Sequence, residues 1–330
     1  MMDQLISRFT EQLNEAIDIG TQAKIRPLAA PVQHVYVGGL GGSGIGADFV
    51  AAFVYQECPV PYLVGKGYEI PAYIGPHSLT IASSYSGNTE ETLTSFEAIQ
   101  KTGARMICIA SGGKIIAAAK ASGLDYVSVP DTWPSPRACL GYSLVVQLCI
   151  LQKLGLIGIG ALEEIRKTIT MLDREEQDIK TRAEKTAQMI FGKLPVIYAT
   201  DRYAPVAVRF RQQINENAKS LGWHHIVPEM NHNELVGWRD VHNDLAVIWF
   251  RSKGDLDRNK VRIDINKEII GNYTSTMVEL YARGDSLIQQ SLYLVHLGDW
   301  ISWYLAQLRG VDAIEVKVID FLKGELAKVN

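Results

Sequence analysis

The sequence has little cysteine, and its cysteines show no pairing pattern. Four occur among 330 residues, at Cys58, Cys108, Cys139 and Cys149, and none forms a Cys-x-x-Cys motif. Each lies in or beside apolar sequence, which is typical of structural thiols rather than of a disulfide framework. We therefore expect reduced, mostly buried cysteines in a cytoplasmic protein.

The sequence also has no excess of positive charge and no long apolar run. Its formal net charge is −3, so no general positive field would attract nucleic acid. The most apolar stretch, residues 142–162, is interrupted by Gln147, Gln152 and Lys153, and therefore does not resemble a membrane-spanning helix. Residues 1–18 have an acidic amphipathic pattern instead of a signal peptide. We expect neither a nucleic-acid partner nor a membrane partner.

The first half of the chain alternates short β-branched runs with helical patterns. Such βαβ order, with apolar strands that carry no polar face, predicts an α/β fold with a buried parallel sheet. The expected strands are 34–39, 60–65, 78–84, 105–113 and 125–130, and the expected helices are 45–56, 89–103, 114–123 and about 142–155.

The second half repeats this order of elements after a long charged helix at 161–190. The expected strands are 194–200, 223–228, 245–252 and 276–282, and the expected helices are 204–220, about 257–270 and 286–309. No sequence repeat accompanies the repeated order. We infer two similar α/β domains, residues 1–155 and 156–330.

The segment 37–49, "VGGLGGSGIGADF", joins the first strand to a helix and contains G-x-G-x-x-G. A dinucleotide site would also need an acidic residue after the second strand, where the chain has Lys66. Glycines at a helix N-terminus expose backbone N–H groups to any anion, and Gly42 and Ser43 lie at that point. The motif therefore indicates an anion site, with a plain strand-to-helix turn as the alternative.

The segment 83–92, "SSYSGNTEET", also lies between a strand and a helix, and it is rich in hydroxyl groups. We expect Asn88 to cap the helix, with Glu91 completing a capping box. One cap needs one side chain, whereas Ser84, Ser86 and Thr89 together could donate to the oxygens of a phosphate. Without a Walker lysine or a cluster of metal ligands, the pattern favours a small phosphorylated molecule over a nucleoside triphosphate.

Four further residues are candidates for chemistry. Arg137, before an apolar helix, is either a solvated loop residue or a cation that stabilises developing negative charge. Glu216 and Lys323 lie on helices, where a surface role is the ordinary interpretation. His232, between asparagines and glutamates in "EMNHNELVGW", is the best proton-transfer candidate among seven histidines.

Six motifs occur along the chain in the following order: "GGSGIG", "SYSGNTEET", "SPRACLGY", "NENAK", "NHNE" and "RGVD…IDFLK". With this ordered set, the sequence resembles the bifunctional phosphoglucose/phosphomannose isomerase family. The resemblance covers nearly the whole chain. It implies two tandem sugar-isomerase (SIS) domains, each a parallel flavodoxin-like sheet flanked by helices. It also implies a homodimer that acts on a sugar 6-phosphate without a cofactor or metal.

The resemblance further implies a role for each candidate. Ser43, Ser84, Ser86 and Thr89 would hold the phosphate. Glu216 would be the base that moves a proton between C2 and C1 of the sugar, and we expect its carboxylate to be buried.

The remaining candidates would assist these steps. His232 would help to open the sugar ring from the partner subunit, Arg137 would steady the enediolate, and Lys323 would act near the ring oxygen.

The C-terminal region departs from the family pattern. Members often have Asp-Pro-Thr after "RGV", whereas this chain reads "RGVDAIEV", with Ala313 and Ile314. This departure weakens the expectation of phosphomannose activity more than that of phosphoglucose activity. Three alternatives stay open: a non-catalytic sugar-phosphate-binding protein, an SIS enzyme acting on an aminosugar or glycated amine, and an NADP-dependent oxidoreductase that uses Lys66.

Overall fold

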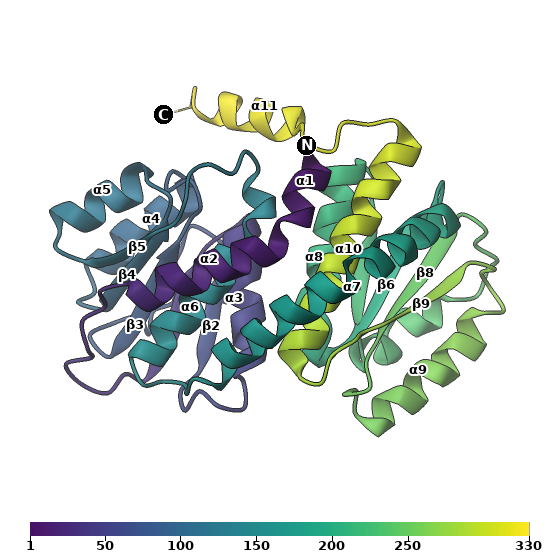
Figure 1. Ribbon diagram of the computed structural model, residues 1–330, viewed down its shortest axis with the longest axis horizontal. Helices are drawn as coiled ribbons and strands as arrows, with labels where there is room; N and C mark the ends of the chain where they lie inside the picture. Colours follow the sequence, from purple (N-terminus) through teal and green to yellow (C-terminus); the bar gives the residue numbers. More distant parts are fainter. Residues whose placement is uncertain (330) are drawn as a thin grey trace. The chain divides into compact units, whose positions relative to one another are not determined.

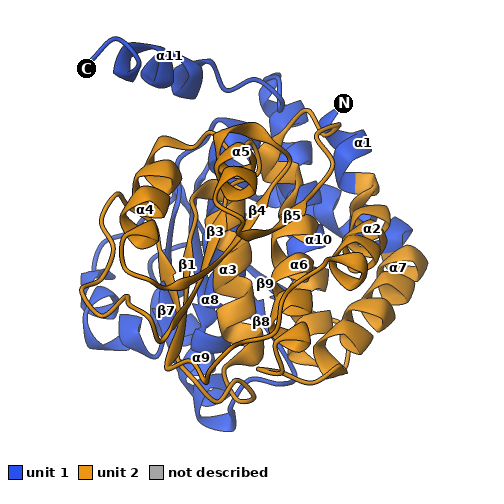
Figure 2. Cartoon of the chain, turned by 90° about the vertical axis from the view of Figure 1, so that its left-hand side faces the viewer, with its two compact units in different colours: residues 1–6, 176–282, 294–330 blue, residues 7–175, 283–293 orange. Residues whose placement is uncertain are grey.

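The computed structural model describes residues 1–329 and divides into two compact α/β units (Figures 1 and 2). Unit 2 comprises residues 7–175 and 283–293, and unit 1 comprises residues 1–6, 176–282 and 294–330. Helix α7 (Gly160–Ile190) contributes to both. These units differ in extent from the predicted domains, 1–155 and 156–330, which stay predictions.

Unit 2 is built on a five-stranded parallel sheet with the order β2-β1-β3-β4-β5. The strands are β1 (His34–Gly38), β2 (Tyr62–Gly65), β3 (Ser78–Ser83), β4 (Arg105–Ala110) and β5 (Asp125–Ser128). Every residue of β1 and β3 is buried, as expected for strands covered on both faces. This order is that of a flavodoxin-like sheet.

The helices of unit 2 cover this sheet. They are α2 (Phe9–Gln22), α3 (Gly41–Val54), α4 (Glu90–Gln100), α5 (Gly113–Ala121) and α6 (Leu140–Lys153). Every residue of α6 from Leu140 to Leu151 is buried, because the helix packs against both α2 and α3.

Unit 1 has a four-stranded parallel sheet with the order β7-β6-β8-β9, equivalent to the first four positions of the other sheet. Its strands are β6 (Leu194–Thr200), β7 (Trp223–Val227), β8 (Leu245–Arg251) and β9 (Met277–Tyr281). Its other helices are α1 (Met2–Ser7, in part), α8 (Ala204–Ala218), α9 (Asp257–Ile270), α10 (Leu287–Arg309, in part) and α11 (Lys317–Leu326). Tyr198 and Trp249 stack in the core of the sheet.

The expected elements are present, with ends that differ by a few residues. The predicted helix 89–103 is shortened to Glu90–Gln100, and the predicted strand 105–113 ends at Ala110 before the turn into α5. Cys108, Cys139 and Cys149 are buried, Cys58 is half-buried, and all four are free thiols, as predicted. Among the described helices, none is both long and apolar enough to cross a bilayer.

Candidate active site

The topological switch point of unit 2 lies between β1 and β3. From these neighbouring strands the sheet continues to β2 on one side and to β4 on the other. Ligands of open parallel sheets bind outside the carboxyl ends of the strands at such a point. The two segments that leave this point are the predicted anion loops, one with Ser43 in the first turn of α3 and the other at residues 84–89.

Hydroxyl groups from both segments meet here. Ser43 Oγ accepts a hydrogen bond from the backbone N–H of Tyr85 at 3.2 Å, which ties the two loops together. Ser84 Oγ lies 2.8 Å from Thr89 Oγ1 and accepts from the N–H of Gly87 at 3.2 Å. The structure therefore brings Ser43, Ser84 and Thr89 into one polar cluster in unit 2.

Ser86 lies on the outer side of this loop. Its side chain is exposed, and its Oγ accepts from the N–H of Asn88 at 3.2 Å. That contact uses a lone pair and leaves the hydroxyl hydrogen available to an anion.

The predicted capping box at Asn88 is wrong. Helix α4 begins at Glu90 with Thr89 as its N-cap, and no side chain caps it. Asn88 Oδ1 instead accepts the N–H of Lys114, at the start of α5, at 3.0 Å, and its Nδ2 donates to the Ser86 carbonyl at 3.2 Å. The asparagine therefore joins the loops after β3 and β4, a contact between residues 26 positions apart.

Arg137 lies beside the same cluster. It belongs to the short 3-10 helix η1 (Pro136–Ala138), and only 7% of the residue is exposed. A Cβ atom on Gly42 would lie 2.9 Å from the Pro136 carbonyl oxygen, so η1 packs directly on the glycine next to Ser43. Gly42, Ser43 and Pro136 line one small pocket. The alternative of a solvated loop arginine is wrong because the residue is buried.

The other three candidates belong to unit 1. Glu216 lies in the last turn of α8 and is half-buried, so it is less buried than expected. His232 ends the 3-10 helix η3 (Glu229–His232) and is exposed. Lys323 is exposed on α11, a helix that buries none of its residues.

Unit 1 has an equivalent switch point, between β6 and β8, but a carboxylate of the chain fills it. Asp255 accepts from Thr200 Oγ1 at 2.8 Å and from the N–H of Ser252 at 2.8 Å. Burial raises the pKa of Asp255, and these hydrogen bonds oppose that rise. Because an internal carboxylate already uses these donors, the hydroxyl loop of unit 2 is the better candidate site for an external anion.

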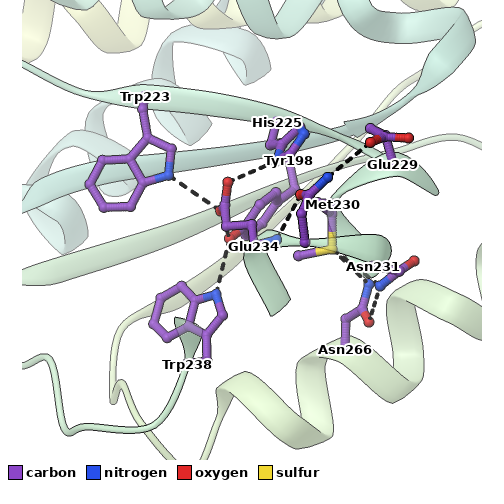
Figure 3. Close-up of polar contacts among 10 residues, drawn as sticks. Tyr198, Trp223, His225, Glu229, Met230, Asn231, Glu234, Trp238 and Asn266 are labelled. Carbon is purple, nitrogen blue, oxygen red and sulfur yellow. Dashed lines mark hydrogen bonds and ion pairs between the residues drawn. The ribbon is translucent and has the colours of Figure 1, made fainter. Parts of the chain in front are cut away.

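Sequence reasoning overlooked a second carboxylate, Glu234, although it belongs to the "NHNE" motif. Its Oε1 accepts from the hydroxyl of Tyr198 and from Trp223 Nε1 at 3.3 Å, and its Oε2 lies 2.8 Å from His225 Nδ1 (Figure 3). The only available signal was the motif itself, since the donors come from strands β6 and β7.

Two similar proteins decide the family. A bifunctional phosphoglucose/phosphomannose isomerase of Caldicellulosiruptor bescii is 35% identical over the full length of both chains. One from Aquifex aeolicus is 36% identical over 90% of this chain and 92% of its own. The chain belongs to the bifunctional phosphoglucose/phosphomannose isomerase family. Residues 179–326 of this isomerase also match the family model described as the bacterial phospho-glucose isomerase C-terminal SIS domain.

The fold of this isomerase is shared more widely. The C-terminal domain of glucosamine-fructose-6-phosphate aminotransferase from Francisella tularensis matches it with a TM-score of 0.77 at 13% identity, over 94% of this chain and 97% of the other. The predicted pair of SIS domains is confirmed. Membership of the isomerase family argues against the NADP-dependent alternative, and the ammonium group of Lys66 is paired with Asp48 on α3.

Proposed function

We propose that the protein interconverts glucose 6-phosphate and fructose 6-phosphate, and also accepts mannose 6-phosphate, through a cis-enediol intermediate. The observation that carries the proposal is the hydroxyl cluster at the switch point of unit 2, in a chain of this isomerase family. Ser43, Ser84, Ser86 and Thr89 would anchor the phosphate, and the energy of that remote contact would position C1 and C2 for reaction.

Proton transfer is assigned to Glu216. Its carboxylate would take the proton from C2 of the open-chain aldose while the C1 oxygen is protonated, which gives the enediol. The C2 hydroxyl would then lose its proton to form the ketone as the carboxylate returns its proton to C1. Half-burial supports this role because it partly desolvates the carboxylate while leaving it accessible.

The other candidates would serve the remaining steps. The buried guanidinium of Arg137 would stabilise negative charge on the enediolate oxygen. His232 would open the ring, and its exposure within its own chain supports a role in the partner subunit's site of a homodimer. Lys323 would assist near the ring oxygen. The free, mostly buried thiols are consistent with a cytoplasmic location.

A proton NMR time course in deuterated water tests the reaction. With glucose 6-phosphate or mannose 6-phosphate as substrate, we expect ketose product and deuterium at C2 of the remaining aldose. Reaction of glucose 6-phosphate alone would restrict the substrate range, as the departure at Ala313 and Ile314 suggests. Binding without any turnover would favour the non-catalytic alternative, and turnover of glucosamine 6-phosphate alone would favour the aminosugar enzyme.

The base is tested by Glu216→Gln, with Glu268→Gln as the control because Glu268 is an exposed glutamate on α9 of the same unit. Loss of the general base should lower kcat by about 10²–10⁴-fold. The control should keep its turnover. A folded Glu216→Gln variant with most of its activity would refute the assignment.

A further inference from the structure

The segment that carries His232 has little regular secondary structure to hold it. After β7 the chain enters η3 and then the 3-10 helix η4 (Glu234–Gly237), each only four residues long. Such short 3-10 turns have few and poorly aligned backbone hydrogen bonds. The conformation of the chain around His232 therefore depends on side-chain contacts.

Glu234 provides the densest of these contacts. It follows His232 by two residues, and its carboxylate accepts from Tyr198 on β6 and from Trp223 and His225 on β7 (Figure 3). A carboxylate can only accept hydrogen bonds, and here its oxygens face donors from two adjacent strands. Its contacts are therefore with the sheet, which suits a structural anchor more than a group that transfers protons.

Tyr198 is fixed in turn as a neutral donor. Burial raises the pKa of its hydroxyl, and the negative charge of Glu234 raises it further. Trp238 Nε1 donates to the same hydroxyl oxygen at 3.2 Å, so the hydroxyl hydrogen is directed to Glu234. The anchor thus reaches from the exposed turn into the buried face of the sheet (Figure 3).

The residues on both sides of His232 are also tied. Asn233 Nδ2 donates to Glu229 Oε1 at 2.8 Å, which spans the histidine, and Asn231 Nδ2 donates to Asn266 Oδ1 on α9 at 2.7 Å. The backbone of the turn is therefore held from three directions. The imidazole of His232 itself is exposed, and it forms no hydrogen bond with the described part of the chain.

We propose that Glu234 is a positioning residue for ring opening: its carboxylate locks the turn to β6 and β7, so that the exposed imidazole of His232 is presented in one orientation. This inference rests on the proposed function, in which His232 opens the sugar ring. Because misplacement by about 1 Å can cost about 10²-fold in rate, loss of the lock should lower kcat more than it changes KM.

The test is a double-mutant cycle on the full chain with glucose 6-phosphate. Glu234→Gln turns one acceptor into an NH₂ group that faces donors, and we expect kcat to fall about 10–100-fold with KM within about twofold. Glu229→Gln, in the same turn, is the control and should keep its turnover because an amide oxygen still accepts from Asn233. In a His232→Ala background, Glu234→Gln should cause no further loss, since Glu234 acts only through His232.

The outcomes separate the two proposals. If His232→Ala keeps its turnover, the ring-opening role of His232 fails, and the inference about Glu234 fails with it. If His232→Ala is impaired but the losses multiply in the double variant, only the positioning role of Glu234 is overturned. Should Glu234→Gln not fold, Tyr198→Phe removes one donor and keeps the carboxylate. It should give a smaller loss of kcat that also disappears in the His232→Ala background, and a multiplied loss would overturn the inference.

Discussion

Replacing Gly87 by alanine tests whether the phosphate loop depends on a residue without a side chain. Gly87 has φ +67°, a conformation that L-residues adopt rarely. A Cβ atom at this position would lie 2.0 Å from the carbonyl oxygen of Gly112, in the loop after β4. That neighbour is backbone, so it cannot rotate away as a side chain could.

The cost follows from these two effects. A left-handed conformation costs an alanine about 1–2 kcal/mol. Overpacking against a fixed neighbour adds about 1–3 kcal/mol. We therefore expect Gly87→Ala to lower the free energy of unfolding by about 2–5 kcal/mol. The Gly87 N–H contacts Ser84 Oγ, so movement of the loop should also displace a phosphate ligand and raise KM for the sugar phosphate.

Gly123→Ala is the matched control. Gly123 has φ +61°, but no atom lies within 4 Å of an added Cβ, so this variant measures the conformational cost alone. Urea unfolding and steady-state kinetics on both variants separate the two effects. We expect Gly123→Ala to lose about 1–2 kcal/mol with KM unchanged. Equal destabilisation of the two variants, with a normal KM for Gly87→Ala, would refute the reasoning.

Two aspartates in ion pairs with arginines give further predictions. Burial favours the neutral form of Asp125, but hydrogen bonds from Arg26 and Arg105 outweigh it and lower the pKa of the carboxyl group. Its stabilising effect is therefore present above pH about 4 and is lost as the pH falls below that value. Asp125→Asn should lower the free energy of unfolding by about 2–3 kcal/mol at pH 7, and this loss of stability relative to wild type should shrink in acid. A loss of stability that does not depend on pH would contradict the role of the Asp125 charge. The buried guanidinium of Arg209 lies 2.6 Å from Asp299 Oδ2. Asp299→Asn removes this carboxylate and should lower the free energy of unfolding, measured in urea, by about 3 kcal/mol. A decrease below about 1 kcal/mol would show that the pair contributes little.

Much of the fold could be predicted because strands that are buried on both faces have continuous apolar sequences. Segments such as 194–200 and 257–270 have the predicted bounds in the structure. The hydroxyl loop could be predicted for a related reason. The carboxyl ends of neighbouring parallel strands meet at one edge, so the loops after β1 and β3 had to lie close together.

The failures concern partners that are distant in the sequence. Asn88 has the sequence of a helix cap, but folding brings it to the N–H of Lys114, which competes successfully for the same oxygen. Asp255 looks like an ordinary loop residue until Thr200, 55 positions away, donates to it.

The sequence by itself determined the α/β alternation, the order of the two halves and the polar loop that follows β3, because these depend on local periodicity and on residues next to one another. Only the tertiary structure decided that Arg137 is buried, that unit 1 fills its own anion position with Asp255, and that Glu234 is held by Tyr198 and His225. The physical reason is that the burial and the hydrogen-bond partners of these polar side chains depend on segments that folding brings together from distant parts of the chain, and no local pattern encodes those contacts.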